Sequence, residues 1–384
     1  MTSEWRTIRA ADFFDFNPRL NLKKGAITTK VAMDKLKPFT KKIPETEKAE
    51  FNGGAKFCNG DTVMARITPC LENGKTAYVD MLDDGEIGFG STEFIVMRAK
   101  TGISDPQFVY YTAINPVFRN VAVKSMVGSS GRQRVQQSVL EELELSVPDL
   151  DEQRRIGDFL AKIDEKIALN DRINDNLADL LQTIYQGRFG NDILAVNQGV
   201  LSDICSYSTD KVAVSELNVR TYFSTENMLS GKAGSTEATS LPTTSQTTAC
   251  HKGDTLISNI RPYFKKIVYC EDKCGCSTDV LCFTPSQPCY SAYLFSTLYA
   301  DKFFAFMVAG SKGTKMPRGD KQQIMTYPVV LPSEEELAGF NTIASPLLEQ
   351  IYSNRAENKR LSILRDTLLP KLMSGEIDVS AIQL

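Results

Sequence analysis

Two stretches of the chain carry apolar residues at the seven-residue spacing that is typical of paired helices. The stretch 149–187 has Ile156, Phe159, Ile163, Ile173, Leu177, Leu180 and Ile184, and the stretch 332–384 has Phe340, Ile343, Leu347, Leu361, Leu364 and Leu368. Apolar residues at the first and fourth heptad positions predict long helices that pack along one seam. Because both helices lie in one chain, we expect them to form an antiparallel coiled coil.

An asparagine interrupts this seam at the same place in each helix. Asn170 and Asn354 are 184 residues apart, which is also the distance between Pro148 and Pro332, the prolines that precede the two helices. A polar residue at such a position lowers stability but fixes register and partner. We therefore expect Asn170 and Asn354 to set the register of the helix pair near its centre.

The second helix contains prolines that the first does not. A proline in a helix interior removes a hydrogen bond and clashes with the preceding turn. Ser345 followed by Pro346 therefore predicts a kink or a restart, with Ser345 as a helix cap. Pro370 and then Gly375 predict the end of this helix.

The rest of the chain is also written twice. Residues 59–69 (NGDTVMARITP) return as residues 252–262 (KGDTLISNIRP), and the triplet STE at 91–93 returns as STD at 277–279. The segment Gly128–Gly131 (GSSG) resembles Gly310–Gly313 (GSKG). Preserved order with shifting offsets indicates two copies of one fold that differ in loop length.

Each copy is predicted to be a mixed α/β block. The Gly-Asp turn at 60–61 leads into a strand-like run, and the aromatic-rich stretches 108–123 and 293–307 are typical of core helices. The predicted organisation is a globular domain at 1–148, a helix at 149–187, a second globular domain at 188–331 and a C-terminal helix at 332–384. The globular blocks are faintly basic and the helical blocks acidic, within a net charge of −3. That difference is too small to prove nucleic-acid binding.

The composition predicts a cytoplasmic protein. No run of about 18 apolar residues is present, as a membrane-spanning helix would need. The segment Met1–Arg6 lacks the basic-then-apolar order of a signal peptide. Seven of the nine cysteines lie between Cys205 and Cys289. Cys250-His251 makes zinc an alternative, but no C-x-x-C pair occurs, so we expect reduced buried thiols and no metal.

Enzyme signatures are weak. Residues 115–118 (NPVF) lack the second proline of an amino-methyltransferase loop, and the Gly-x-Gly at 88–90 stands without a strand-turn-helix frame. The single histidine, His251, excludes most histidine-based acid–base mechanisms. We expect no catalytic residues and no cofactor. A DNA methyltransferase with a fused recognition domain and a protein-binding coiled-coil adaptor remain the alternatives.

The helical stretches resemble the conserved regions of type I restriction-modification specificity subunits. The resemblance lies in residues 151–156 (DEQRRI), 164–167 (DEKI) and 174–177 (NDNL), and in 364–377 (LRDTLLPKLMSGEI) near the C-terminus. It implies two target-recognition domains that read the halves of a bipartite double-stranded DNA site. It also implies that the helices separate these domains and dock two methyltransferase subunits, through which motor-nuclease subunits join.

Candidate DNA-contacting residues lie in loops with fork-shaped or paired hydrogen-bond donors. Two loops follow the Gly-Ser segments, and a second pair of candidates lies just beyond the repeated turn. The candidates are Arg66, Arg132, Gln133, Arg134, Arg261, Tyr263, Lys312, Lys315 and Arg318. Lys23-Lys24 and Lys41-Lys42 are expected to hold phosphate, which positions a protein without specifying sequence.

Overall fold

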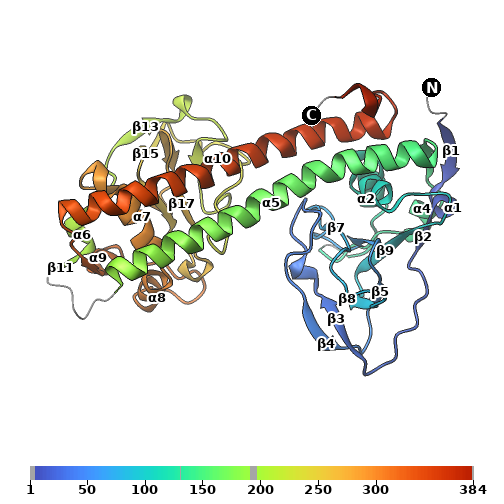
Figure 1. The fold of residues 1–384 in the computed structure, drawn as a ribbon, viewed down its shortest axis with the longest axis horizontal. Coiled ribbons are helices and arrows are strands. Elements are labelled where there is room, and N and C mark those ends of the chain that lie inside the picture. The colour runs from blue at the N-terminus through green and yellow to red at the C-terminus, as the bar shows by residue number, and fades with distance from the viewer. Residues whose placement is uncertain (1–4, 130, 191–196, 383–384) are drawn as a thin grey trace. The chain divides into compact units, whose positions relative to one another are not determined.

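The computed structural model describes residues 5–382 except residue 130 and residues 191–196. Met1–Glu4, part of the N-terminal segment considered above, lies outside the described residues. The chain divides into two compact units, Met1–Asn170 with Glu357–Leu384, and Asp171–Ala356. Two 40-residue helices, α5 (Leu150–Phe189) and α10 (Glu334–Met373), contribute to both units. Figure 1 labels these elements.

The first unit contains two four-stranded sheets, ordered β2-β9-β6-β7 and β4-β3-β8-β5. Helix α2 packs with β2, β6, β9 and α5 around one aromatic-rich core. The strands are β1 (Arg6–Arg9), β2 (Phe14–Phe16), β3 (Ile27–Val31), β4 (Glu47–Glu50), β5 (Ala55–Phe57), β6 (Thr62–Ala65), β7 (Thr76–Tyr78), β8 (Gly88–Gly90), β9 (Phe94–Ala99) and β10 (Glu144–Val147). The helices are α1 (Ala10–Phe13), α2 (Pro106–Ile114), α3 (Pro116–Lys124), α4 (Gln137–Glu141) and the 3-10 turns η1 (Met33–Lys35) and η5 (Val379–Ala381).

The second unit repeats this plan with sheets ordered β12-β19-β16-β17 and β13-β15-β18-β14. Its strands are β11 (Gln198–Val200), β12 (Cys205–Tyr207), β13 (Lys211–Ala213), β14 (Tyr222–Phe223), β15 (Gln246–Cys250), β16 (Thr255–Ser258), β17 (Ile267–Tyr269), β18 (Cys274–Cys276), β19 (Val280–Pro285) and β20 (Pro328–Val330). Its helices are α6 (Leu201–Ile204), α7 (Ser291–Tyr299), α8 (Asp301–Ala309), α9 (Lys321–Met325) and the turns η2 (Val214–Glu216), η3 (Pro262–Phe264) and η4 (Pro288–Tyr290). The prediction of two mixed α/β repeats with two long helices is confirmed.

Strand register shows how closely the two copies correspond. Thr62 pairs with Tyr78 in β7, and Thr255 pairs with Tyr269 in β17. The repeated turn before each strand places Gly60 and Gly253 at φ 91° and 92°, a left-handed conformation that favours glycine. Gly60 N–H donates to the Val79 carbonyl, and Gly253 N–H donates to the Cys270 carbonyl. The Gly-Asp motif is repeated because both copies need the same turn.

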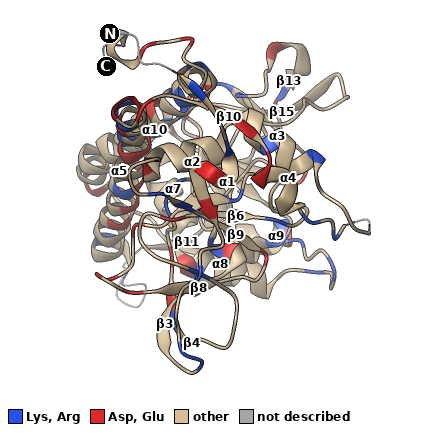
Figure 2. Ribbon diagram, turned by 90° about the vertical axis from the view of Figure 1, so that its right-hand side faces the viewer, with Lys and Arg blue, Asp and Glu red and all other residues tan. Residues whose placement is uncertain are grey.

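The long helices differ from their predicted seam in several places. Leu180, Ile343 and Leu364 are exposed, while Leu181 and Leu348 are buried in the core of the second unit. A helix with 3.6 residues per turn drifts away from a strict seven-residue repeat, so one-residue shifts accumulate along 40 residues. Figure 2 marks the charged residues along α5 and α10.

The predicted restart at Pro346 is wrong. Helix α10 continues through both Pro346 and Pro370 to Met373, before Gly375 at φ 75°. Pro346 and Thr342, whose carbonyl loses its helical hydrogen bond, are both exposed. Water can satisfy that carbonyl, so the helix tolerates the proline.

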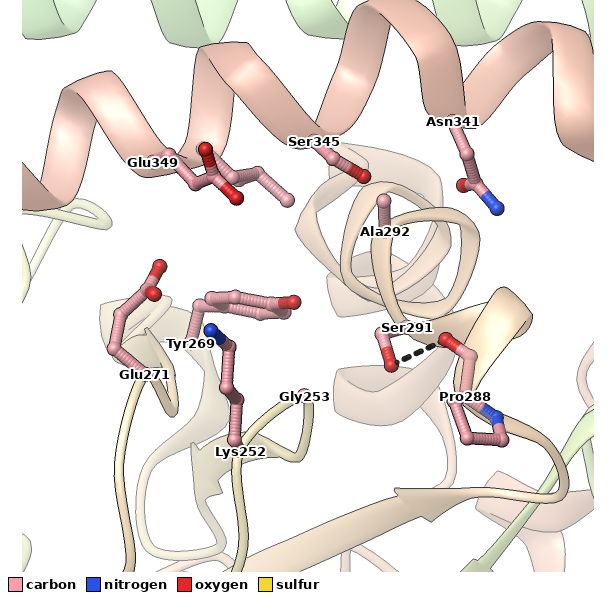
Figure 3. A pocket seen from close by; sticks show the side chains of 11 residues that line it. Lys252, Gly253, Tyr269, Glu271, Pro288, Ser291, Ala292, Asn341, Ser345 and Glu349 are labelled. Carbon is pink, nitrogen blue, oxygen red and sulfur yellow. Dashed lines mark hydrogen bonds between the residues drawn. The ribbon is translucent and has the colours of Figure 1, made fainter.

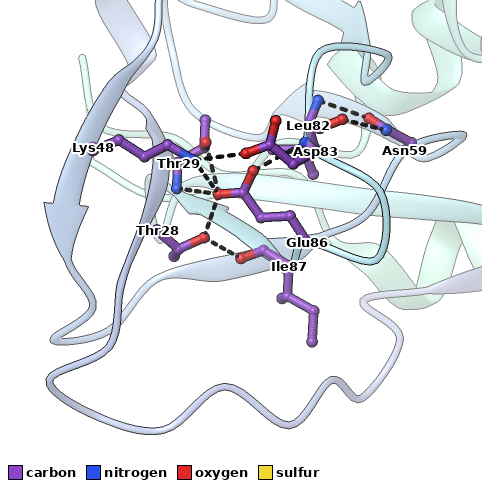
Figure 4. Close-up of polar contacts among 8 residues, drawn as sticks. All are labelled: Thr28, Thr29, Lys48, Asn59, Leu82, Asp83, Glu86 and Ile87. Atoms are coloured by element: carbon purple, nitrogen blue, oxygen red, sulfur yellow. Dashed lines mark hydrogen bonds and ion pairs between the residues drawn. The ribbon is translucent and has the colours of Figure 1, made fainter.

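A carboxylate locks the β3–β4 hairpin onto the loop that precedes β8 (Figure 4). Glu86 Oε1 accepts hydrogen bonds from Thr28 Oγ1 (2.7 Å), the Thr29 backbone N–H (2.8 Å) and Lys48 Nζ (2.8 Å). Burial opposes ionisation of Glu86, but these bonds outweigh it and hold its pKa well below the ordinary range.

Glu86→Gln is expected to destabilise the first unit by about 2 kcal/mol, because charged hydrogen bonds are lost inside a packed turn. The depressed pKa means that the lock is intact above the ordinary glutamate pKa and weakens as pH falls through the folded-state value. Urea unfolding of both proteins at neutral and acidic pH measures this. Glu47→Gln, which removes an exposed ion pair to Lys30, is the control and should cost well under about 1 kcal/mol. Equal effects of the two substitutions would contradict the lock.

Candidate nucleic-acid interface

Each unit has a short closed loop after the second helix of its helix pair. In the first unit Val127 and Arg134 exchange two backbone hydrogen bonds, of 3.0 and 2.9 Å, after α3. In the second unit Lys312 and Arg318 exchange two bonds of 2.9 Å after α8. We call these segments loop 1 (127–134) and loop 2 (312–318). Residue 130 of loop 1 lies outside the described residues.

The loops occupy equivalent positions in the two copies. Thr68 N–H donates to the Gln133 carbonyl in loop 1, and Arg261 N–H donates to the Pro317 carbonyl in loop 2. These contacts align Val127 with Lys312 and Gly128 with Gly313. The sequence-based alignment of Gly128 with Gly310 is therefore wrong by three residues, because Gly310 caps α8 and does not belong to loop 2.

An arginine–carboxylate pair joins each loop to the turn that precedes β9 or β19. Arg134 Nη2 lies 2.6 Å from Glu93 Oε1, and its Nε donates to the same carboxylate at 2.9 Å. Arg318 Nη2 lies 3.0 Å from Asp279 Oδ1. The hydrogen bond from Arg134 lowers the pKa of Glu93, although burial opposes the shift. We call these two contacts the loop latches.

Sequence reasoning did not find the carboxylates of the latches. Glu93 and Asp279 end the repeated triplets STE and STD. The acidic residue at the end of both triplets was the sequence signal from which these carboxylates could have been found. Arg134 and Arg318, which we expected to contact DNA, are engaged in the latches, so their DNA contact stays a prediction.

The other loop candidates differ in exposure and partners. Arg132 and Lys315 are exposed, and among the described residues neither has an ion pair. Gln133 is half-buried, and its backbone N–H donates to Thr68 Oγ1. Lys312 Nζ lies 2.5 Å from Asp320 Oδ2. The structure thus groups Arg132 with Gln133 on loop 1, and Lys312 with Lys315 on loop 2.

Arg66 and Arg261 are not equivalent residues. Arg66 N–H donates to the Glu93 carbonyl as Asn259 N–H donates to Asp279, so Arg66 corresponds to Asn259. Arg66 is half-buried with Nε 4.0 Å from Glu93 Oε2, beside the first latch. Arg261 has φ 51° and lies immediately before the turn η3, as its N-cap residue.

The turn η3 exposes two aromatic side chains, of which only Tyr263 was a candidate from the sequence. Tyr263 is 51% exposed and Phe264 39% exposed, and their ring centroids lie 4.8 Å apart. Met316 of loop 2 is also exposed. Exposed apolar side chains can contact thymine methyl groups, and neighbouring basic side chains can donate hydrogen bonds to base edges.

The expected phosphate-binding lysines separate into exposed and buried ones. Lys23 and Lys24 are exposed, and Lys42 lies 3.5 Å from Asp80. Lys41 is buried, which removes it from any DNA surface. Its aromatic surroundings, not visible in the sequence, explain the difference.

The register asparagines each find a partner across the helix pair within their own unit. Asn170 Nδ2 donates to Asn358 Oδ1 (2.8 Å) in the first unit, and Asn354 Nδ2 donates to Asn174 Oδ1 (2.9 Å) in the second. Asn174 and Asn358 are themselves 184 residues apart. The two contacts are therefore the same contact in two copies. In each unit α5 and α10 are antiparallel.

Residues considered for chemistry have structural roles. The Asn115 side chain accepts the Val117 N–H and caps α3, and Gly88–Gly90 forms β8. Six of the seven cysteines between 205 and 289 are buried free thiols, and Cys289 is exposed. Across residues 5–382 without the gaps named above, no group of three or more His, Cys, Asp or Glu side chains is arranged to hold a metal. In the same part of the chain, no helix is long and apolar enough to span a membrane.

Comparison with known proteins agrees with this geometry. Residues 2–178 match the family described as type I restriction modification DNA specificity domain. The Escherichia coli EcoAI specificity subunit is 38% identical over 104 residues, 27% of this chain and 18% of the relative. The EcoEI specificity subunit of the same species is 32% identical over 111 residues, 29% of this chain and 18% of the relative. These matches therefore span less than a fifth of either relative.

A solved structure extends the likeness to the whole fold. The type I restriction-modification S subunit from M. genitalium aligns over 96% of both chains, with a TM-score of 0.55 and 18% identity. The duplicated α/β blocks and paired helices define a specificity-subunit fold. Residues 2–178 thus carry a type I restriction modification DNA specificity domain, and the chain has the fold of that S subunit, as the resemblance of its helices predicted.

Proposed function

We propose that this chain is a non-catalytic subunit that reads a bipartite double-stranded DNA site, with one half-site assigned to each globular block. The duplicated loop and its latch carry the proposal. A latched loop is pre-organised, so less conformational entropy is lost when it meets DNA.

The loops supply suitable chemistry for reading base pairs. Arg132 and Gln133 on loop 1, and Lys315 on loop 2, offer donors to base edges in the major groove. Tyr263 offers an apolar surface beside loop 2. We assign Arg134 and Arg318 to holding the loops and Arg66 to supporting the first latch. Lys312, Arg261 and the exposed Lys23 and Lys24 are assigned to the surrounding contacts.

The paired helices would hold the two reading blocks and bind the other subunits. We propose that two methyltransferase subunits dock on α5 and α10 and that motor-nuclease subunits join through them in the cytoplasm. Catalysis and cofactor binding would reside in those subunits. The proposed domains are residues 1–148 and 188–331, with connecting helices at 149–187 and 332–384.

Exchange of one block tests the assignment. Replacing residues 1–148 by the corresponding block of a relative with another target should change one half of the methylated motif and leave the other half intact. Mapping methylated sites in cells that carry the hybrid and its methyltransferase subunit measures this. The reciprocal exchange of residues 188–331 is the matched control. A hybrid that changes both halves, or neither, would contradict the proposal.

A further inference from the structure

A cavity of about 340 Å³ opens in the second unit between the end of β17, the start of α7 and one face of α10. Figure 3 shows Tyr269 and Glu271 on one side of it, and Asn341, Ser345 and Glu349 of α10 on the other. Lys252 is exposed, and Figure 3 shows its side chain directed toward Tyr269 and Glu271. The cavity is separate from loop 2 and its latch.

Two buried acceptor atoms of this cavity have no partner. Glu271 Oε1 and Asn341 Oδ1 are both shielded from solvent and accept no hydrogen bond in the described structure. The Asn341 amide nitrogen is already used, since it donates to the Cys289 carbonyl at 2.7 Å. Burial raises the pKa of Glu271. Unpaired buried acceptors are costly, and a guest that relieves them must be a hydrogen-bond donor.

The first unit shows what occupies the equivalent space. The strand register equates Tyr78 with Tyr269, and therefore Asp80 with Glu271. The helix offset of 184 equates Glu165 with Glu349. In the first unit this space holds the Lys41 ammonium, which donates to Gln107 Oε1 and to Tyr111 Oη (3.2 Å).

The Lys41 ammonium is surrounded by aromatic rings and carboxylates. It lies 5.3 Å from the Tyr78 ring centroid and 4.9 Å from that of Tyr111. Burial lowers the pKa of Lys41 to about 8, while Asp164, Glu165 and Asp80 oppose that shift. Two of these three carboxylates, Asp80 and Glu165, have acidic counterparts in the second unit.

The second copy lacks a lysine at the corresponding backbone position. Phe39 and Lys232 share a positive φ, 54° and 65°, and their N–H groups donate to the carbonyls of Gly74 and Lys265. Lys41 follows Phe39 by two residues, and Gly234 follows Lys232 by two. Gly234 has no side chain and faces Arg355 of α10, whose Cζ lies 3.1 Å from the position a Cβ would take, so this segment places no cation in the cavity.

Neighbouring substitutions enlarge the same space. The helix pairs equate Gln107 with Ala292 and Tyr111 with Ser296, because Pro106 and Ser291 begin α2 and α7. Both replacements in the second copy are smaller. The second unit thus keeps counterparts of two of the three carboxylates and of the tyrosine ring of β7, and the lysine that lines its cavity, Lys252, is exposed where Lys41 is buried.

We propose that this cavity binds a protonated primary amine on an alkyl chain, held by Glu271, Asn341 and Glu349 against the Tyr269 ring. The amine belongs to a free alkylamine or to a lysine side chain of a bound protein, which present the same chemistry. The proposal does not depend on DNA reading.

n-Butylammonium is the direct probe, with 1-butanol as its uncharged counterpart. Ligand-observed NMR titration of the full chain should show binding of n-butylammonium and not of 1-butanol. Glu271→Gln should weaken the binding about tenfold or more, because a charged hydrogen bond is lost. Equal binding of the two probes, or no effect of Glu271→Gln, would overturn the proposal.

Lys41→Ala provides a matched control in the first unit. It opens the equivalent cavity, so n-butylammonium should raise the unfolding midpoint of Lys41→Ala more than that of the unsubstituted chain, and 1-butanol should not. Lys252→Met tests whether this lysine, which lines the cavity, is itself the cation that occupies it. Binding of n-butylammonium by Lys252→Met alone, and not by the unsubstituted chain, would also overturn the proposal.

The two sources of the amine are distinguished by adding the methyltransferase subunit. Loss of n-butylammonium binding in that complex, when Glu271→Gln also weakens the complex, assigns the cavity to a lysine of the subunit. Retained binding assigns it to a free alkylamine.

Discussion

Replacing Arg365 by methionine is expected to destabilise the first unit by about 4 kcal/mol, because it leaves a buried carboxylate without its partner. Arg365 Nη1 lies 2.6 Å from Asp164 Oδ1, and both side chains are more than nine-tenths buried. Tyr111 Oη donates to the other Asp164 oxygen at 2.6 Å. Urea unfolding measures the loss. Lys166→Met, which removes an exposed ion pair to Glu357, is the control and should cost less than about 1 kcal/mol.

The second copy of the fold shows which residues can replace the Asp164–Arg365 ion pair. The helix offset of 184 equates Asp164 with Leu348 and Arg365 with Leu181, and both leucines are buried in the core of the second unit. The double substitution Asp164→Leu with Arg365→Leu should therefore recover most of the stability lost in either single variant. Additive losses in the double variant would contradict this account.

Arg134→Ala and Arg318→Ala are each expected to weaken specific DNA binding by the reconstituted methyltransferase complex about tenfold or more. Each substitution releases one latch, so one reading loop must be ordered at the expense of binding free energy. Arg134→Ala should lose discrimination at one half-site only, and Arg318→Ala at the other. Fluorescence anisotropy on duplexes with one altered half-site at a time measures both effects.

Arg9→Ala is the matched control for the latches, since it also removes one exposed arginine with carboxylate partners. It should change affinity little and discrimination not at all. Loss of discrimination at both half-sites from a single latch variant would show that the loops do not read independently. Glu93→Gln should reproduce the effect of Arg134→Ala, which separates the latch from a direct arginine contact to DNA.

The fold was predictable because it is encoded by local signals that occur twice. The Gly-Asp turns at 60–61 and 253–254 need the same backbone, and Asn170 and Asn354 lie at the same helical position. The continuous course of α10 through Pro346 was not predictable, because the sequence does not show which face of α10 meets solvent. The seam error at Leu180 has a similar cause, since an assumed seven-residue period cannot follow the drift of a long helix.

The candidate site was predictable only in part. The loops at 127–134 and 312–318 were found from glycine and basic residues, but the pairing of Arg134 with Glu93 joins residues 41 positions apart. No local pattern reveals such a pair. Lys41 was assigned to a surface role together with the adjacent Lys42, whereas its neighbours in space are aromatic.

The latches also affect how the salt dependence of DNA binding should be interpreted. The slope of log affinity against log salt concentration counts phosphate contacts, provided that the protein itself is unchanged by salt. Arg134 and Arg318 are about half exposed, at 46% and 53%, so mobile ions weaken their attraction to the carboxylates over the same concentration range. Part of the measured slope would then report loosening of the loops. A phosphate count taken from the unsubstituted chain would be too high, and titration of the Glu93→Gln variant would give the correction.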